Sequence, residues 1–184
     1  STTVQSTNPA SGGADTLIGD GGDDTIIGGQ GADTISGGAG NDRAAGDGAS
    51  IQVSGVDFLF QSTDAGDGAA DTIVGGAGND ILIGGAGGDT IDGDAGNDVL
   101  VGDHANVLFA GTGRFIRLIS IETALGGDDD LDQSGHAGAD ILVGGAGRDN
   151  LRGGTGNDDD VLLGDHGEVR ADDGTAQALS LIHI

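Results

Sequence analysis

Large aliphatic residues recur at every ninth position over much of the chain, separated by polar segments rich in glycine. Residues 28–36 read Gly-Gly-Gln-Gly-Ala-Asp-Thr-Ile-Ser, and residues 75–83, 84–92, 93–101 and 144–152 repeat this form. The shared pattern is G-G-x-G-x-D-x-U-x, in which U is a large aliphatic residue. Side chains alternate along a strand, so position 8 points inward while positions 7 and 9 point outward. A flexible glycine-rich linker would not keep an aliphatic residue in register, and the pattern therefore predicts short stacked strands.

Position 8 supplies one aliphatic column for each predicted sheet, which makes a thin core. The two columns together contain Leu17, Ile26, Ile35, Ala44, Ile73, Leu82, Ile91, Leu100, Leu131, Leu142, Leu151 and Leu162. The outward positions are mainly polar after odd-numbered turns, as at Thr34 and Ser36, and become apolar after even-numbered turns, as at Ile81 and Ile83. Because a contiguous exposed apolar face usually marks something that covers it, one face of the predicted structure needs a cover.

Position 6 is aspartate in three blocks of four repeats. These residues are Asp15, Asp24, Asp33, Asp42, Asp71, Asp80, Asp89, Asp98, Asp129, Asp140, Asp149 and Asp160. A Gly-Asp pair follows each block, at 46–47, 102–103 and 164–165, and the turn then fails to close on schedule. We interpret this as an excursion inserted inside each of these turns, which closes at Asp71 after the first and at Asp129 after the second.

The predicted organisation therefore alternates roll and excursion, in a chain expected to be a fragment. The expected segments are the end of a preceding excursion at 1–9, β-roll blocks at 10–47, 69–103 and 127–165, excursions at 48–68 and 104–126, a truncated excursion at 166–178, and a tail at 179–184. The tail reads Leu-Ser-Leu-Ile-His-Ile, which CTG-TCT-CTT-ATA-CAC-ATC would encode. That string resembles a sequencing-library adapter, so we hypothesise that the tail is a read-through scar.

The excursions contain all four phenylalanines of the chain, Phe58, Phe60, Phe109 and Phe115, within hairpin-like strand patterns. Four half-coils separate consecutive excursions, so they leave from the same edge. We expect each to fold back over the apolar face and make the roll three-layered. A lateral wing and a docking surface for another protein are the alternatives.

The composition is acidic and rich in glycine, with 31 acidic residues, 6 basic residues, 41 glycines and a net charge of -25. Nucleic acid and anionic membranes are not expected partners, because phosphate contacts need Lys and Arg. The absence of cysteine excludes a disulfide framework, and no run of 18 apolar residues predicts a membrane span. We found no catalytic motif, and we do not expect an enzyme.

The repeat resembles the RTX (repeats-in-toxin) calcium-binding nonapeptide family over roughly residues 10–165, apart from the two interruptions. The resemblance implies an all-β fold, a right-handed parallel β-roll with several Ca²⁺ ions held between its turns. It assigns the ligands to the position-6 carboxylates and to carbonyls of the glycines before them. The implied metal ligands are the position-6 aspartates given above, with Asp158 as a rival to Asp160, and Gly29, Gly31, Gly38, Gly40, Gly76, Gly78, Gly85, Gly87, Gly145 and Gly147.

Calcium also suits the residues themselves. Turns one coil apart lie about 4.8 Å from each other, and Ca²⁺ takes six to eight hard oxygen ligands in flexible geometry. The expected pairs lie two repeats apart, as Asp15 with Asp33 and Asp24 with Asp42, and Asp33 with Asp71 if the roll runs unbroken. Without a cation the carboxylates repel, so metal binding should be coupled to folding. The alternative is that these aspartates only cap turns through hydrogen bonds.

Three functions fit these features. The first is a calcium-stabilised structural segment of a large secreted RTX protein, such as an adhesin or a toxin-like exoprotein, with calcium and adjoining repeats of the parent chain as partners. The second is the tail of a secreted metalloprotease or lipase. An ice-binding surface, suggested by the column Thr16, Thr34, Thr72 and Thr90, is the third, but no second regular column lies beside it. The first two place the protein outside the cell or at its surface.

Overall fold

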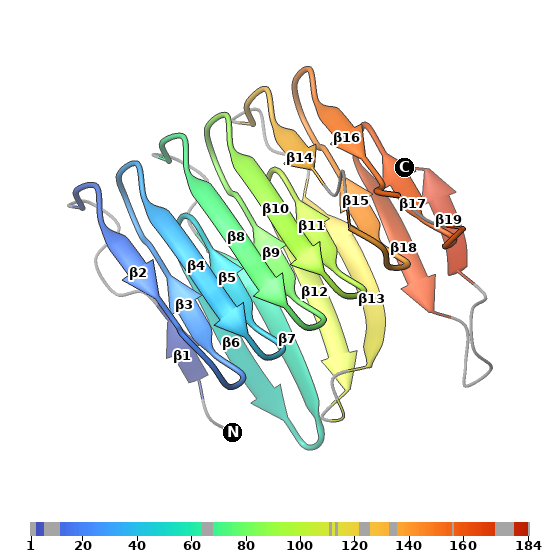
Figure 1. Cartoon of the computed structure of the whole chain (residues 1–184), viewed down its shortest axis with the longest axis horizontal. Coiled ribbons are helices and arrows are strands. Elements are labelled where there is room, and N and C mark those ends of the chain that lie inside the picture. The colour runs from blue at the N-terminus through green and yellow to red at the C-terminus, as the bar shows by residue number, and fades with distance from the viewer. Residues whose placement is uncertain are drawn as a thin grey trace.

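The chain folds into three stacked β-sheets, with no helix among the residues that the structure describes (Figure 1). The computed structural model describes residues 3–5, 12–63, 68–110, 112, 114–121, 126–132, 136–155, 157–171 and 179–183. Within these residues, no helix is long and apolar enough to cross a membrane. Two sheets are parallel and come from the repeats, and the third is antiparallel and comes mainly from the excursions.

The strand after each odd-numbered turn joins one parallel sheet, called here the outer sheet, and the strand after each even-numbered turn joins the middle sheet. The outer sheet contains β2 (Thr16–Ile18), β4 (Thr34–Ala39), β8 (Thr72–Ala77), β10 (Thr90–Ala95), β14 (Asp130–Asp132) and β16 (Asn150–Arg152). The middle sheet contains β3 (Thr25–Ile27), β5 (Arg43–Ala45), β9 (Ile81–Ile83), β11 (Val99–Val101), β15 (Ile141–Val143) and β17 (Val161–Leu163). Strands on either side of an excursion still pair in register, with Ile35 opposite Ile73 and Ile91 opposite Leu131, so the roll is unbroken.

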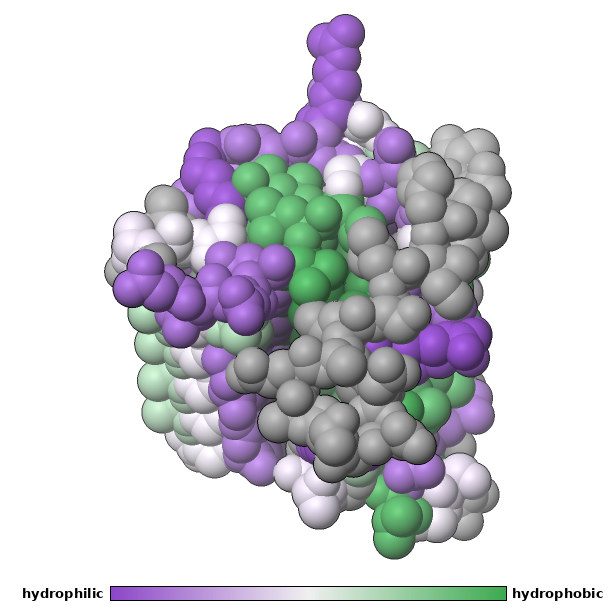
Figure 2. All heavy atoms as spheres, turned by 90° about the vertical axis from the view of Figure 1, so that its right-hand side faces the viewer, coloured by the Kyte–Doolittle hydropathy of each residue, from purple (hydrophilic) through white to green (hydrophobic). Residues whose placement is uncertain are grey.

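The first core lies between these two sheets and consists of the position-8 column. Ile73, Ile91 and Leu100 are fully buried there, whereas Leu17 near one end of the stack is only partly buried. Leu162 is 44% exposed, because β17 is the last strand of the middle sheet and nothing stacks beyond it in the described chain. Seen from that end, apolar residues gather between hydrophilic ones (Figure 2).

The excursions form a third layer, called here the hairpin sheet. It contains β1 (Thr3–Gln5), β6 (Ala49–Ser54), β7 (Asp57–Ser62), β12 (Ala105–Ala110), β13 (Phe115–Ser120), β18 (Gly167–Ala171) and β19 (Leu179–His183). β6 and β7 form one hairpin and β12 and β13 another, and all strands of this sheet pair antiparallel. β19 comprises most of the tail that we suspect to be a read-through scar, and it pairs with β18. This pairing does not test the origin of the tail, which stays a prediction.

A second core joins the hairpin sheet to the apolar face of the middle sheet. Phe60 and Phe109 are fully buried against residues such as Ile83 and Val101, and Phe58 and Phe115 are partly buried at the margin. The expected cover is therefore present, and the roll is three-layered (Figure 1).

One feature of the strands differs from expectation. β4, β8 and β10 each contain six residues and not three. Each continues through the first three positions of the next turn, because Ala39 and Ala77 pair across neighbouring coils just as Thr34 and Thr72 do.

Candidate metal sites

Two ladders of aspartates run along the two edges of the roll. In each ladder, the backbone N–H of one position-6 aspartate donates to the Oδ1 atom of the aspartate one coil further on, at 2.7–3.1 Å. The odd ladder links Asp15, Asp33, Asp71, Asp89, Asp129 and Asp149, and the even ladder links Asp24, Asp42, Asp80, Asp98, Asp140 and Asp160. Both ladders continue past the excursions, so the pairs expected only for an unbroken roll are formed.

The second carboxylate oxygen of these residues has a different environment. Within the described chain, the Oδ2 atom is buried and has no hydrogen-bond partner in Asp24, Asp33, Asp42, Asp71, Asp80, Asp89 and Asp129. Burying a polar atom without a partner is unfavourable, and burying an unpaired charge is much more so. Turn capping accounts for Oδ1 and leaves Oδ2 unexplained. A bound cation would offset the cost of burying such an oxygen.

The unpartnered oxygens face carbonyl groups across a space that only glycine leaves open. A Cβ atom added to Gly75 would lie 2.5 Å from Asp80 Oδ2 and 2.9 Å from the carbonyl oxygen of Gly93 in the next coil. Gly28 and Gly84 show the same arrangement. A carboxylate oxygen and a carbonyl oxygen thus converge at the first position of these turns, and such hard oxygen donors are what Ca²⁺ takes. The residues present therefore fit a calcium ion.

The glycines expected as ligands shape the turns in which these oxygens converge. All ten have a positive φ, between 108° at Gly76 and 142° at Gly78. The carbonyls of Gly38 and Gly40 point across the gap toward Gly76 and Gly78 of the next coil. Carbonyls of position-1 glycines, such as those of Gly46 and Gly93, lie beside the same space as the Oδ2 atoms, and we did not single these glycines out as ligands from the sequence. Which glycine carbonyls would bind a metal stays a prediction.

Burial and stacking of like charges raise the pKa of several ladder aspartates. Burial is the main cause and the carboxylates of neighbouring coils add to it, which raises the pKa of Asp89 to about 9, of Asp71 and Asp129 to about 7, and of Asp80 to about 6. The backbone N–H bonds to Oδ1 act in the opposite direction and do not compensate. Without a cation, these four carboxyls therefore take up protons at a higher pH than ordinary aspartates do.

The turns that carry the first two excursions each contain an additional buried aspartate at position 2. Asp47 Oδ2 accepts the backbone N–H of Ala86 at 2.6 Å, and Asp103 accepts those of Gly127 and Ala146. Asp47 raises the pKa of Asp71 and Asp89, so its carboxylate lies in the field of that pair. Asp47 and Asp103 are both hydrogen-bonded to the following coil. These bonds fix the first half of a turn whose second half comes about 20 residues later, after the excursion. The Gly-Asp pairs were the sequence signal for these two aspartates.

The third block shows which of two rival residues completes its last turn. Asp140 N–H donates to Asp160 Oδ1 at 3.0 Å, and a Cβ on Gly153 would lie 2.6 Å from Asp160 Oδ2. Asp160 therefore takes position 6 of this turn. Asp158 lies beside it on a cavity of about 30 Å³ that His136 also lines. Both Asp158 and Asp160 are exposed, whereas Asp33, Asp42 and the four ladder aspartates of the second block are buried.

The structure has the features of a calcium-binding β-roll. Short parallel strands form the roll, and its stacked glycine-rich turns bring paired carboxylates and carbonyls together. The family model of the RTX calcium-binding nonapeptide repeat matches the chain in four copies, at residues 9–44, 65–100 and 134–159. The matched residues make up more than half of the chain. The protein therefore belongs to the RTX calcium-binding nonapeptide repeat family, whose repeats bind Ca²⁺ and serve a structural role. No curated protein matches it.

Proposed function

We propose that this chain is a calcium-stabilised structural segment of a secreted RTX protein, with ions held between successive aspartates of each ladder. The observation that carries the proposal is the set of buried Oδ2 atoms that have no hydrogen-bond partner and face a carbonyl of the next coil. Asp33, Asp71 and Asp89 would supply carboxylate oxygens on the odd edge, and Asp42, Asp80 and Asp98 on the even edge. A bound Ca²⁺ would supply the positive charge that these carboxylates lack.

The residues of the chain account for a switch between an unfolded and a folded state. Twelve stacked carboxylates repel one another, and a thin aliphatic column does not offset that repulsion. Folding is then coupled to metal binding. Extracellular calcium modules have dissociation constants of about 10⁻⁴–10⁻³ M, so a chain of this kind would fold after export. We place it outside the cell or at its surface, within an adhesin or toxin-like exoprotein.

In this proposal the roll blocks at 10–47, 69–103 and 127–165 are the calcium-dependent spacer, and the excursions at 48–68 and 104–126 are its cover. Stacking of coil on coil makes the segment extendable by further repeats. The rival function, a tail that follows a metalloprotease or a lipase, would require a catalytic domain in the same reading frame, which recovery of that frame would reveal.

Isothermal titration calorimetry on the purified chain tests the proposal. We expect saturable binding of several Ca²⁺ ions at millimolar concentration, and weak binding of Mg²⁺, which demands octahedral geometry and gives up its water reluctantly. The double variant Asp71→Asn, Asp89→Asn should bind fewer ions than the wild type. Asp159→Asn, which removes an exposed carboxylate outside the ladders, is the control and should leave the stoichiometry unchanged. Absence of calcium uptake by the wild type would contradict the proposal.

A further inference from the structure

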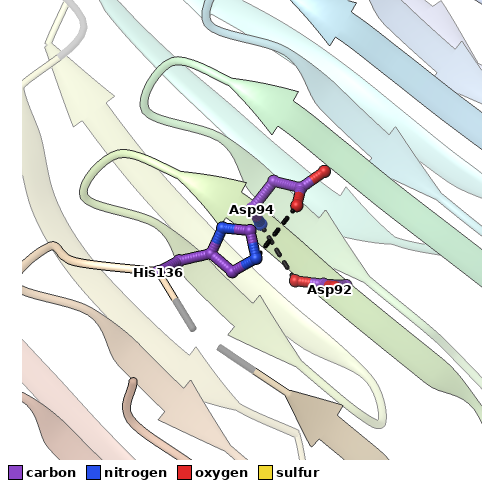
Figure 3. Close-up of side chains that lie close together, drawn as sticks. All are labelled: Asp92, Asp94 and His136. Carbon is purple, nitrogen blue, oxygen red and sulfur yellow. Dashed lines mark hydrogen bonds and ion pairs between the residues drawn. The ribbon is translucent and has the colours of Figure 1, made fainter. Parts of the chain in front are cut away.

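Three side chains with metal-binding atoms, none of which belongs to an aspartate ladder, meet at the outer sheet (Figure 3). They are Asp92, Asp94 and His136, and each offers one ligand atom within 4.8 Å of the other two. His136 Nε2 lies 3.2 Å from Asp94 Oδ1. All three residues are partly exposed, so an ion could reach them from solvent.

The repeat brings these residues together by stacking. Asp94 and His136 both occupy position 2 of a turn, where the repeat usually has glycine, and they are 42 residues apart. Asp98 and Asp140, which pair in the even ladder, have the same separation. Asp94 and His136 are therefore corresponding residues of neighbouring coils.

The third residue of the group, Asp92, lies on β10 at position 9 of the preceding repeat, two residues before Asp94. Its Oδ1 atom accepts the backbone N–H of Asp94 at 3.0 Å, which directs its carboxylate toward the same imidazole (Figure 3). Asp94 has a φ of 65°, a conformation that costs most residues other than glycine about 1–2 kcal/mol. The turn thus keeps an aspartate at a place where glycine would fit more easily.

The ligand set differs in kind from the calcium sites. Ca²⁺ is held by oxygen ligands, whereas an imidazole nitrogen with two carboxylates suits Zn²⁺ and related transition metals. Two ligands each about 2.1 Å from one ion, at tetrahedral or octahedral angles, stand about 3.0–3.4 Å apart. The measured 3.2 Å between His136 Nε2 and Asp94 Oδ1 lies within this range.

The surrounding charge favours a cation at this place. Burial raises the pKa of Asp92, and the carboxylates of Asp94 and Asp132 raise it further. Arg152, on β16 two strands along the outer sheet from Asp92, has its guanidinium bound to Asp130 and Asp132. The imidazole of His136 lowers the pKa of Asp92, so it lies in the field of that carboxylate.

We propose that Asp92, Asp94 and His136 form a second kind of metal site, specific for a transition metal of the zinc type. The ion would join the turn at 93–98 to the turn residues 136–140. These turns are neighbours in space but lie on opposite sides of the second excursion in sequence, so the site would clip the third roll block to the second. The site forms only in the folded roll, so this inference rests on the proposed function for folding. Its ligands are separate from the proposed calcium ligands.

Zinc titration of the calcium-saturated chain tests this site, with circular dichroism first confirming that each variant is folded. We expect one Zn²⁺ ion to bind, and Co²⁺ to give visible absorption bands of a nitrogen-ligated centre. Asp94→Gly restores the usual glycine of the repeat and His136→Gln removes the nitrogen. Each should weaken Zn²⁺ binding about tenfold or more, since even outer-shell changes cost metal sites 10–100-fold. Neither should alter calcium uptake.

Asp20→Gly is the matched control, because Asp20 also occupies position 2 with a φ of 66° but is followed in its column by Gly38. It should bind Zn²⁺ as the wild type does. Unchanged zinc affinity in either Asp94→Gly or His136→Gln, or no zinc uptake by the folded wild type, would show that the group is only an ion pair. Failure of the proposed function would be seen separately, as a chain that does not fold in calcium.

Discussion

The two carboxylate oxygens have separate roles in six ladder aspartates, namely Asp33, Asp42, Asp71, Asp80, Asp89 and Asp129. Oδ1 accepts a backbone N–H from the preceding coil, as Asp80 does from Asp42, and this bond sets the register of the stack. Oδ2 is buried without a donor and faces a glycine carbonyl. A repeat that spaced aspartates only to cap turns would not need to bury the second oxygen. The pairing of Oδ2 with a carbonyl is the residue-level basis for calcium.

The raised pKa values predict that acid stabilises the calcium-free chain. The ordinary aspartate pKa is 3.8, and in the folded state it rises to about 9 at Asp89, about 7 at Asp71 and Asp129, and about 6 at Asp80. Because the folded state binds protons more tightly, this stabilisation is fully present below the unfolded value and is lost as pH rises through 6 to 9. Circular dichroism in chelator should therefore show more strand at pH 5 than at pH 8. Less strand at pH 5 would contradict the account.

Neutralising one ladder carboxylate should have opposite effects with and without calcium. Asp89→Asn removes the carboxylate whose pKa burial raises most. In calcium it loses a ligand, and we expect the free energy of unfolding to fall by about 1–3 kcal/mol, as for an unsatisfied buried partner. In chelator it removes the cost of protonating or burying that carboxylate on folding, so strand content should rise. Urea unfolding in both conditions measures this. A change of the same sign in both, or an equal change in the exposed Asp159→Asn, would be inconsistent with a metal ligand.

At the scale of the turn, neighbouring glycines serve different purposes. Gly28 has no positive φ, yet a Cβ there would lie under 3.0 Å from Asp33 Oδ2 and from the carbonyl oxygen of Gly46. Gly29 has a φ of 109° and open space around its Cβ position. The first glycine leaves room for the convergent oxygens, and the second permits the backbone to turn.

Alanine substitutions separate these roles. Gly28→Ala fills the space between the oxygens, and overpacking of this kind costs about 1–3 kcal/mol. We expect the calcium concentration at half-folding to rise about tenfold. Gly29→Ala should lower stability by about 1–2 kcal/mol through its φ alone, with calcium stoichiometry unchanged. Calcium titrations of both variants, followed by circular dichroism and calorimetry, distinguish the two. Equal loss of bound ions in both variants would argue against the distinction.

At the scale of the element, the hairpin sheet packs against the roll and should stabilise it. Phe109 is fully buried, stacks on Phe58 with ring centroids 5.4 Å apart, and lies 4.8 Å from the guanidinium carbon of Arg43. Phe109→Ala should lower the free energy of unfolding in saturating calcium by about 3–5 kcal/mol, measured by urea. Val56→Ala, at a residue 76% exposed, should change it by less than about 0.5 kcal/mol. A small effect at Phe109 would mean that the cover is dispensable.

Much of this arrangement was predictable from period and parity. The nine-residue repeat predicted both sheets, because Ile73 and Leu82 alternate between them, and the blocks of four predicted the closure at Asp71 and Asp129. The apolar faces at Ile81 and Val99 predicted a cover. The separate environments of Oδ1 and Oδ2 were not predictable, since a spacing does not specify which oxygen a backbone N–H reaches.

Irregular positions were also beyond sequence reasoning. Extra residues near Asp140 and Asp160 left the register of the third block open, and only the hydrogen bond between them resolves it. The same insertion obscured the fact that His136 corresponds to Asp94, so their meeting was not foreseen. The six-residue strands depend on pairing between Ala39 and Ala77, which the three-residue strand pattern does not imply.

At the scale of the whole molecule, the fold is a balance between two thin cores and two lines of charge. The net charge is -25 and the described aromatic side chains number four, all in the hairpin strands. The roll itself has only aliphatic columns to offset the repulsion within each ladder. A balance of this kind is shifted by whatever supplies positive charge between the coils, and all parts of the roll should respond together.

Calcium removal tests this balance most directly. Far-ultraviolet circular dichroism of the intact chain at pH 7.5 should show a largely disordered chain in chelator and a β-rich one in millimolar calcium, with reversible interconversion. Magnesium at the same concentration should not substitute, which controls for ionic strength. Equal strand content in chelator and in calcium would contradict the account, because it would mean that the stacked carboxylates need no metal to stay folded.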